Sequence, residues 1–166
     1  MTTTIASRLQ AVHDRITTVA QSCGRKPGEI TLLAASKTNP AERLREAWQA
    51  GQNIFGENYL QEALAKMQHL TDLPIEWHFI GPIQSNKTRR ISENFSWVHS
   101  VDRAKIADRL SKDRPESLPP LQICLQVNVS GEASKSGVAP EELASLAAHA
   151  VRLPRLKLRG LIAVPE

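Results

Sequence analysis

A regular alternation of strand-like and helix-like segments constrains the fold of this chain most strongly. Short apolar runs of strand length are separated by stretches whose apolar residues recur at helical spacing. The strand-like runs are 30–37, 53–57, 76–81, 96–101, 121–129 and 158–164. The helix-like stretches are 3–23, 40–50, 58–70, 103–112 and 140–152. This order predicts an α/β fold in which helical crossovers join parallel strands.

The similar size of the units favours a TIM-type barrel over a doubly wound sheet. Strand-like runs begin every 20 to 37 residues, and the two commonest glycine-rich nucleotide-binding motifs are absent from the sequence. A closed barrel needs eight strands and about 250 residues, whereas these 166 residues supply six strands. We therefore expect a single domain over residues 1–166 with about six of the eight β/α units, either as an open sheet or as part of a longer polypeptide.

Composition excludes several classes of protein. No apolar run is long enough to cross a bilayer, and the N-terminus has no basic segment followed by an apolar one, so neither a membrane protein nor a secretion signal is expected. Cys23 and Cys124 lie far apart and away from any His/Cys cluster, which indicates reduced thiols and a cytoplasmic location.

The net charge of +4 is concentrated in residues 84–115, which hold eight basic and four acidic side chains. A basic stretch can mark a nucleic-acid surface. However, these residues spread over two helical segments, and the aromatic content of 4% leaves few stacking platforms. We interpret the stretch as a solvated helix surface, with a site for a phosphorylated small molecule as the second interpretation and nucleic acid as the weakest.

Polar residues gather where the strand-like runs end. In a parallel α/β fold these ends meet at one face, where ligands bind. The polar strand-end residues are Ser36, Lys37, Glu57, Asn58, His78, Gln84, Asn86, Lys87, Asn128, Glu132 and Lys135. A lysine amine in a partly desolvated site can lose its proton and form an imine with a carbonyl. Lys37 is therefore either an imine-forming residue or a strand-end lysine that reaches solvent.

Several of these positions keep two interpretations. His78 alternates with Trp77 and Phe79, so it faces the barrel interior if those two face the helices; it is either a core histidine with one hydrogen bond or part of a site. Glu57 is either a charge partner of Lys37 or a surface acid. The loop 130–137 is either an anion nest or a flexible connection. Neither the spacing of a metal site nor that of a serine nucleophile is present.

Five ordered motifs carry a family resemblance. They are L-L-A-A-S-K-T, F-G-E-N-Y-x-Q-E, W-H-F-I-G-P-x-Q-S-N-K, N-V-S-x-E-x-x-K-S-G and R-G-L-I-A-V-P. Together they resemble the pyridoxal-phosphate homeostasis protein family, also called proline synthase co-transcribed homologues, from about residue 5 to the last residue.

The resemblance implies an alanine-racemase-like barrel of the fold-type III class in a single domain. It implies that Lys37 holds pyridoxal 5′-phosphate as an internal imine, that Asn58 lies beside the cofactor, and that Lys135 is a basic residue near the site mouth. With His78 from the strand pattern, these make the predicted cofactor-binding set; no catalytic residue and no metal ligand is predicted.

The function implied is intracellular homeostasis of the cofactor without an established reaction, with PLP-dependent apo-enzymes as partners. The alternative is an amino-acid racemase, which needs two bases. The usual second base is a tyrosine from a second domain, whereas this sequence has one tyrosine, Tyr59, and is expected to form a single domain. Family members continue with two more units that hold the phosphate, and this sequence stops before them. A closed barrel is expected to be a monomer, and an incomplete one can pair through its open edge.

Overall fold

Six parallel strands form one sheet in a computed structural model that describes residues 4–132 and 136–164. The strands are β1 (Ala34–Ala35), β2 (Ile54–Glu57), β3 (Glu76–Phe79), β4 (Trp97–Val101), β5 (Leu121–Val127) and β6 (Leu156–Ala163). Their order in the sheet is the same as their order in the chain, and every neighbouring pair is parallel. Each crossover therefore leads to the adjacent strand, as in the β/α barrel that the sequence predicts.

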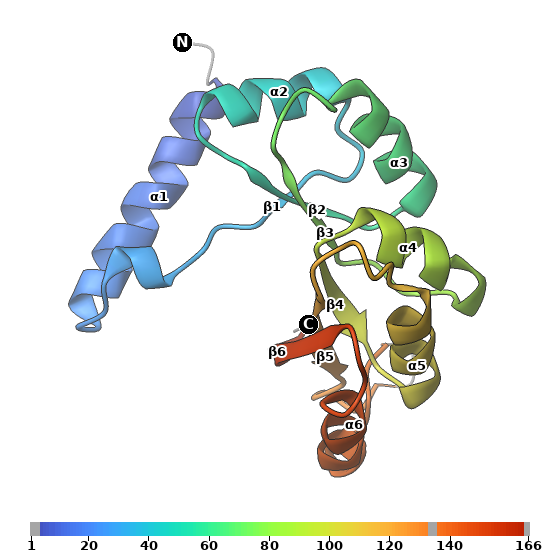
Figure 1. Ribbon diagram of the computed structural model, residues 1–166. Coiled ribbons are helices and arrows are strands. Elements are labelled where there is room, and N and C mark those ends of the chain that lie inside the picture. Colours follow the sequence, from blue (N-terminus) through green and yellow to red (C-terminus); the bar gives the residue numbers. More distant parts are fainter. Residues whose placement is uncertain (1–3, 133–135, 165–166) are drawn as a thin grey trace.

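The helices form an arc along one side of this sheet, from α1 round to α6 (Figure 1). They are α1 (Ile5–Ser22), α2 (Ala41–Gln49), α3 (Leu60–His69), α4 (Thr88–Asn94), α5 (Ala104–Asp113) and α6 (Leu143–Ala150). Three short 3₁₀ turns are η1 (Pro27–Glu29), η2 (Ser85–Lys87) and η3 (Pro140–Glu142). The described part of the chain holds no helix whose length and apolarity would let it span a membrane.

Local sequence signals set the helix ends. The Thr4 hydroxyl accepts a hydrogen bond from the Ser7 amide at 3.1 Å and so caps the start of α1. Gly24 (φ +70°) and Gly51 (φ +95°) follow α1 and α2 in the left-handed region that glycine adopts without strain. Both helices therefore end within one or two residues of the predicted ranges 3–23 and 40–50.

The hydrophobic core fills the space between the sheet and the helices. Phe79 and Phe95 meet edge to face with their centroids 5.3 Å apart, and Ile106, Leu110 and Leu125 are fully buried around them. Each such side chain contributes about 1.5–3 kcal/mol through burial. Trp77 and Phe79 belong to this core, so the even-numbered residues of β3 face the opposite, inner side of the sheet.

Some boundaries differ from the sequence prediction. The run 30–37 forms a strand only at Ala34–Ala35, because the Leu32 carbonyl accepts a hydrogen bond from the Gln52 side chain at 2.9 Å rather than from a strand neighbour. The sixth strand begins at Leu156, two residues before the predicted start. The predicted helix 140–152 divides into η3 and α6, and α4 is a helix whose bounds the sequence did not give.

Candidate functional site

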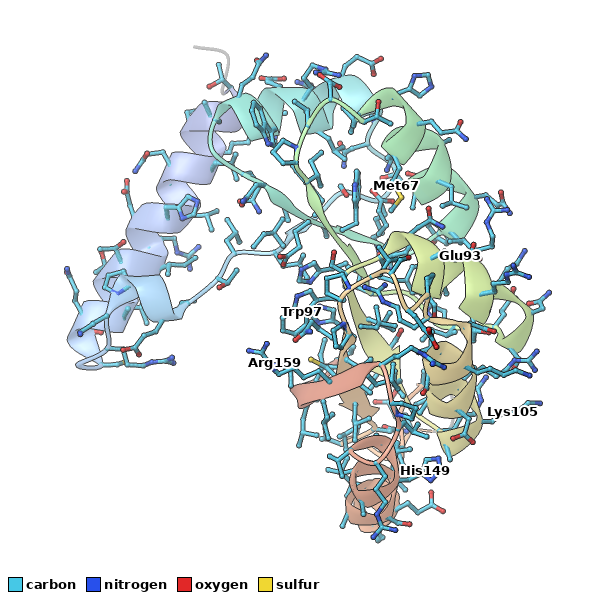
Figure 2. The ribbon with its side chains drawn as sticks, in the orientation of Figure 1. Met67, Glu93, Trp97, Lys105, His149 and Arg159 are labelled. Atoms are coloured by element: carbon cyan, nitrogen blue, oxygen red, sulfur yellow. The ribbon has the colours of Figure 1, made fainter. Side chains whose placement is uncertain are left out.

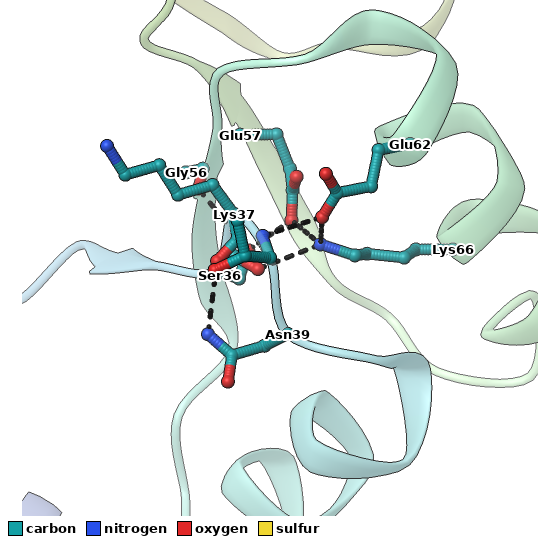
Figure 3. A network of polar contacts seen from close by, with 8 residues as sticks. Ser36, Lys37, Asn39, Gly56, Glu57, Glu62 and Lys66 are labelled. Carbon is teal, nitrogen blue, oxygen red and sulfur yellow. Dashed lines mark hydrogen bonds and ion pairs between the residues drawn. The ribbon is translucent and has the colours of Figure 1, made fainter.

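Lys37 lies two residues beyond β1, at the carboxyl end of the sheet. The Ser36 amide still donates to the Gly56 carbonyl at 2.9 Å, which continues the pairing of β1 with β2. The Lys37 side chain is exposed, and its amine points away from the polar groups behind it (Figure 3). Among the described residues, none forms a hydrogen bond or ion pair with Lys37 Nζ, so the amine is accessible for covalent chemistry.

A buried polar network lies behind Lys37, on the helix side of the sheet. Glu57 Oε1 accepts hydrogen bonds from Ser36 Oγ at 2.5 Å and from Lys66 Nζ at 2.8 Å. Glu57 is fully buried and Lys66 is 5% exposed. Both interpretations of Glu57 from the sequence are therefore wrong: it is neither a partner of Lys37 nor a surface acid, because a buried carboxylate needs an opposite charge and α3 supplies Lys66.

Asn58 follows β2 directly, at the end of the sheet where Lys37 follows β1. Ala35 is opposite Gly56 in the β1–β2 register, so these neighbouring strands deliver Lys37 and Asn58 to the same end of the sheet. Asn58 Oδ1 is buried, and no described residue donates a hydrogen bond to it. A Cβ on Gly81 would lie 2.2 Å from the Asn58 carbonyl oxygen, so glycine is needed for the loop after β3 to approach this strand end. The site thus offers an accessible amine with an unused amide oxygen nearby.

His78 lies on the inner face of the sheet, as the alternation predicts. Its Nε2 is 2.7 Å from Glu76 Oε1, and its Nδ1 is 2.8 Å from His99 Nε2. The Trp97 ring stacks on the imidazole with centroids 5.2 Å apart. Both ring nitrogens therefore have a hydrogen-bond partner, whereas the interpretation as a core histidine expected only one. A cofactor role for His78 stays a prediction.

Burial sets the protonation of this histidine pair. It lowers the pKa of His78, against an opposing effect of the Glu76 carboxylate. Burial, with a smaller contribution from His78, lowers the pKa of His99 to about 4. Arg159 on β6 lies over the Trp97 ring, 5.2 Å from its centroid, and donates to Gln122 Oε1 at 2.8 Å. Figure 2 shows Trp97 and Arg159 on the side of the sheet away from α4 and α5, so the inner face is polar and partly charged.

Two predicted features lie wholly or partly outside the described residues. Lys135 is one of residues 133–135, which the structure does not describe, so its predicted place near the site mouth stays a prediction. At the start of the same loop, the Gly131 amide donates to Asn128 Oδ1 at 3.1 Å, and Asn128 Nδ2 donates to the Glu132 carbonyl at 2.9 Å. The anion nest is likewise untested.

The remaining candidate chemistry is limited. No group of three or more metal-ligating side chains occurs in the parts of the chain that are described, and Cys23 and Cys124 are free thiols. In the basic stretch, Arg89 pairs with Glu93 and Arg103 with Asp102. Arg114 is buried and donates to the Ser92 and Phe95 carbonyls at 2.6 and 2.8 Å. Part of the positive charge is therefore used within the fold.

Sequence reasoning missed the residues that support the site from neighbouring elements. Glu62 and Lys66 are four residues apart on α3, a spacing that signals a helix-surface pair but not its contact with the Lys37 loop. His99 reaches His78 only because the β3–β4 register sets Trp97 opposite His78, which brings the next inward residue of β4 within reach. A single sequence does not reveal the register between strands or the contacts between elements, so Glu62, Lys66 and His99 could not be predicted as partners.

Comparison with known proteins identifies the family of this chain. The family model of the alanine racemase N-terminal domain matches residues 7–165. The pyridoxal phosphate homeostasis protein of Pseudomonas aeruginosa is 64% identical over 163 residues, which span 98% of this chain and 71% of that protein. The protein of the same name from Escherichia coli K12 is 54% identical over 164 residues, covering 97% of this chain and 70% of its own length.

Solved structures show the same fold. PipY of Synechococcus elongatus with PLP bound has a TM-score of 0.77 and 38% identity, over 90% of this chain and 70% of that chain. The alanine racemase of Corynebacterium glutamicum, 16% identical over 93% of this chain and 44% of its own, has a TM-score of 0.61 and supports the fold alone. The alanine-racemase-like barrel architecture is thus confirmed. This chain belongs to the pyridoxal phosphate homeostasis protein family.

Proposed function

We propose that this chain binds pyridoxal 5′-phosphate on Lys37 and serves cytoplasmic homeostasis of that cofactor. The observation that carries the proposal is the placement of Lys37: an exposed amine at the carboxyl end of a barrel strand, turned away from the buried charges behind it. The names of the curated relatives and the cofactor bound to PipY support it.

The described residues fit such a ligand. When bound, pyridoxal phosphate supplies an aldehyde carbon that a neutral lysine amine can attack. Lys37 would hold the group covalently through its amine, with the aldehyde oxygen leaving as water. Asn58, at the same end of the sheet, has a buried amide oxygen free to accept a hydrogen bond. His78 and Lys135 complete the proposed binding set.

Homeostasis without turnover is the form of the function that we propose. The names of the relatives indicate a homeostasis protein rather than an enzyme. Racemization requires a proton donor and acceptor on opposite faces of the substrate carbon. Tyr59 is exposed and lines a hollow with Pro82 and Gln84, and nothing in its surroundings assigns it as a second base.

Partners and assembly follow as further proposals. Apo-enzymes that require the cofactor are the proposed recipients, and residues 1–166 are proposed to act as one domain. The described sheet has β1 and β6 as its two edge strands, so pairing of two copies along an edge stays a prediction.

The test is covalent trapping. The protein is mixed with pyridoxal 5′-phosphate, reduced with borohydride, and analysed by intact mass and peptide mapping. We expect one adduct, on Lys37, that is lost in Lys37→Ala and kept in a control, Lys105→Ala, which removes an exposed lysine on α5. An unchanged adduct in Lys37→Ala would contradict the proposal. Turnover is tested by incubation with L-alanine followed by chiral analysis. Racemization no faster than with the free cofactor would support homeostasis without turnover, and faster racemization would contradict it.

A further inference from the structure

We propose that Lys66 and Glu62 are positioning residues that clamp the two peptide groups flanking Lys37 and thereby aim its side chain at the inner face of the sheet. The inference rests on the proposed function, because it assigns Lys37 as the ligand-holding residue. Neither side chain is expected to touch the ligand, since both approach the strand end from the helix side (Figure 3).

The clamp holds the chain before and after Lys37. Lys66 Nζ donates to the carbonyl oxygen of Ser36 at 2.8 Å, which fixes the peptide group between residues 36 and 37. Glu62 Oε1 accepts a hydrogen bond from the Thr38 amide at 2.7 Å, which fixes the next peptide group. With both peptide planes held, the direction of the Cα–Cβ bond of Lys37 is set.

The two clamping side chains are themselves held. Lys66 Nζ lies 2.6 Å from Glu62 Oε1 and 2.8 Å from Glu57 Oε1, so its three contacts match the three donors of an ammonium group. The hydrogen bond from Lys66, followed by that from the Thr38 amide, lowers the pKa of Glu62. Glu62 is therefore an anion at neutral pH and bridges Lys66 to the Thr38 amide.

Backbone conformation gives an independent reason for a clamp. Thr38 has φ +62°, in the left-handed region that a β-branched residue rarely adopts. Such a conformation persists only where surrounding interactions hold it, and it occurs preferentially at ligand-holding sites. The bond from the Thr38 amide to Glu62 helps to hold it here, together with the bonds that Asn39 donates to the Ser36 and Lys37 carbonyls at 3.1 and 3.2 Å.

The test compares Glu62→Ala with Glu93→Ala. Glu93 is a matched control, since it also forms an i,i+4 ion pair with a basic residue and its side chain is 34% exposed, against 33% for Glu62. Glu62→Gln keeps an acceptor for the Thr38 amide and serves as the conservative variant. Lys66→Met removes the other half of the clamp, and circular dichroism and urea unfolding establish which variants are folded.

Two readouts are taken. In the protein without ligand, we expect amide hydrogen exchange at Thr38 to rise about tenfold or more in Glu62→Ala, to stay unchanged in Glu93→Ala, and to be largely restored in Glu62→Gln. With pyridoxal 5′-phosphate, we expect the dissociation constant, followed by absorbance, to rise about tenfold or more in Glu62→Ala, because a misplaced amine loses its geometry for attack. A folded Lys66→Met is expected to behave as Glu62→Ala does.

The outcomes separate the two proposals. Failure of the unmodified chain to form a Lys37 adduct overturns the proposed function, and Thr38 exchange without ligand still decides whether the clamp exists. If Glu62→Ala matches Glu93→Ala in exchange and, where binding occurs, in affinity, the clamp is refuted. A rise in exchange with unchanged affinity also overturns the proposal, because the clamp would then not position the amine.

Discussion

The histidine pair on the inner face of the sheet is the residue-scale feature with the clearest pH signature. Its neighbours are the Glu76 carboxylate, the Trp97 ring and, across that ring, the Arg159 guanidinium. The lowered pKa of His99 means that the unfolded chain binds protons more readily than the folded chain. By linkage, its contribution to stability is complete above about pH 6.5 and is lost as pH falls towards about 4.

We therefore expect the free energy of unfolding to decrease between pH 6.5 and about 4, and His99→Gln to flatten this dependence. Urea unfolding at a series of pH values measures it. His13→Gln, on the exposed side of α1, is the control and should leave the slope intact. An unchanged slope in His99→Gln would contradict this prediction and show that other groups, such as His78 and the carboxylates, set the acid sensitivity.

At the same scale, the sequence predicted residue positions better than residue partners. Lys37 and His78 are where the strand pattern places them, because alternation along one strand is a local property. Glu57 was misjudged because its burial depends on Lys66 from another element. His99 was missed because it joins the site only through strand register. Single-chain patterns give the face of a strand but not what lies across from it.

At the scale of elements, α1 differs from the other helices in how little of it is buried. Ala20 is its one buried residue among 18, whereas α5 buries Ile106, Ala107, Leu110 and Ser111. Local opening costs least where few apolar contacts are lost. We expect amide protons of α1 to exchange at a lower free energy of opening than those of α5, measured by native-state hydrogen exchange. Equal protection would mean that α1 unfolds only with the whole molecule.

Helix α1 also shows why element prediction succeeded. Apolar residues at helical spacing are a local signal, and the helix 3–23 predicted from them corresponds to Ile5–Ser22. The first strand shows why its boundaries were predicted wrongly. Leu32 and Leu33 have strand-like sequence, yet the Leu32 carbonyl accepts a hydrogen bond from the Gln52 side chain. A tertiary contact of this kind leaves no trace in local periodicity.

At the scale of the whole molecule, the core forms one contiguous cluster that extends from Leu44 on α2 to Ala150 on α6. A single cluster predicts one cooperative unfolding transition, since no part of it can lose its packing without exposing the rest. This also tests the proposal that residues 1–166 act as one domain.

Tryptophan positions make the cooperativity measurable. Trp48 lies on α2, near one edge of the sheet, and Trp97 lies on β4, near the other half. In Trp48→Phe and Trp97→Phe, the remaining fluorescence reports mainly on one half each, with Trp77 common to both. We expect the fluorescence and circular dichroism transitions to coincide within each variant, and the two variants to unfold with similar dependence on urea. In Trp97→Phe, a fluorescence transition at lower urea than the loss of circular dichroism would instead show that the β1–β2 half unfolds separately. The core contacts of α2 would then be weaker than those that hold β4, β5 and β6 together.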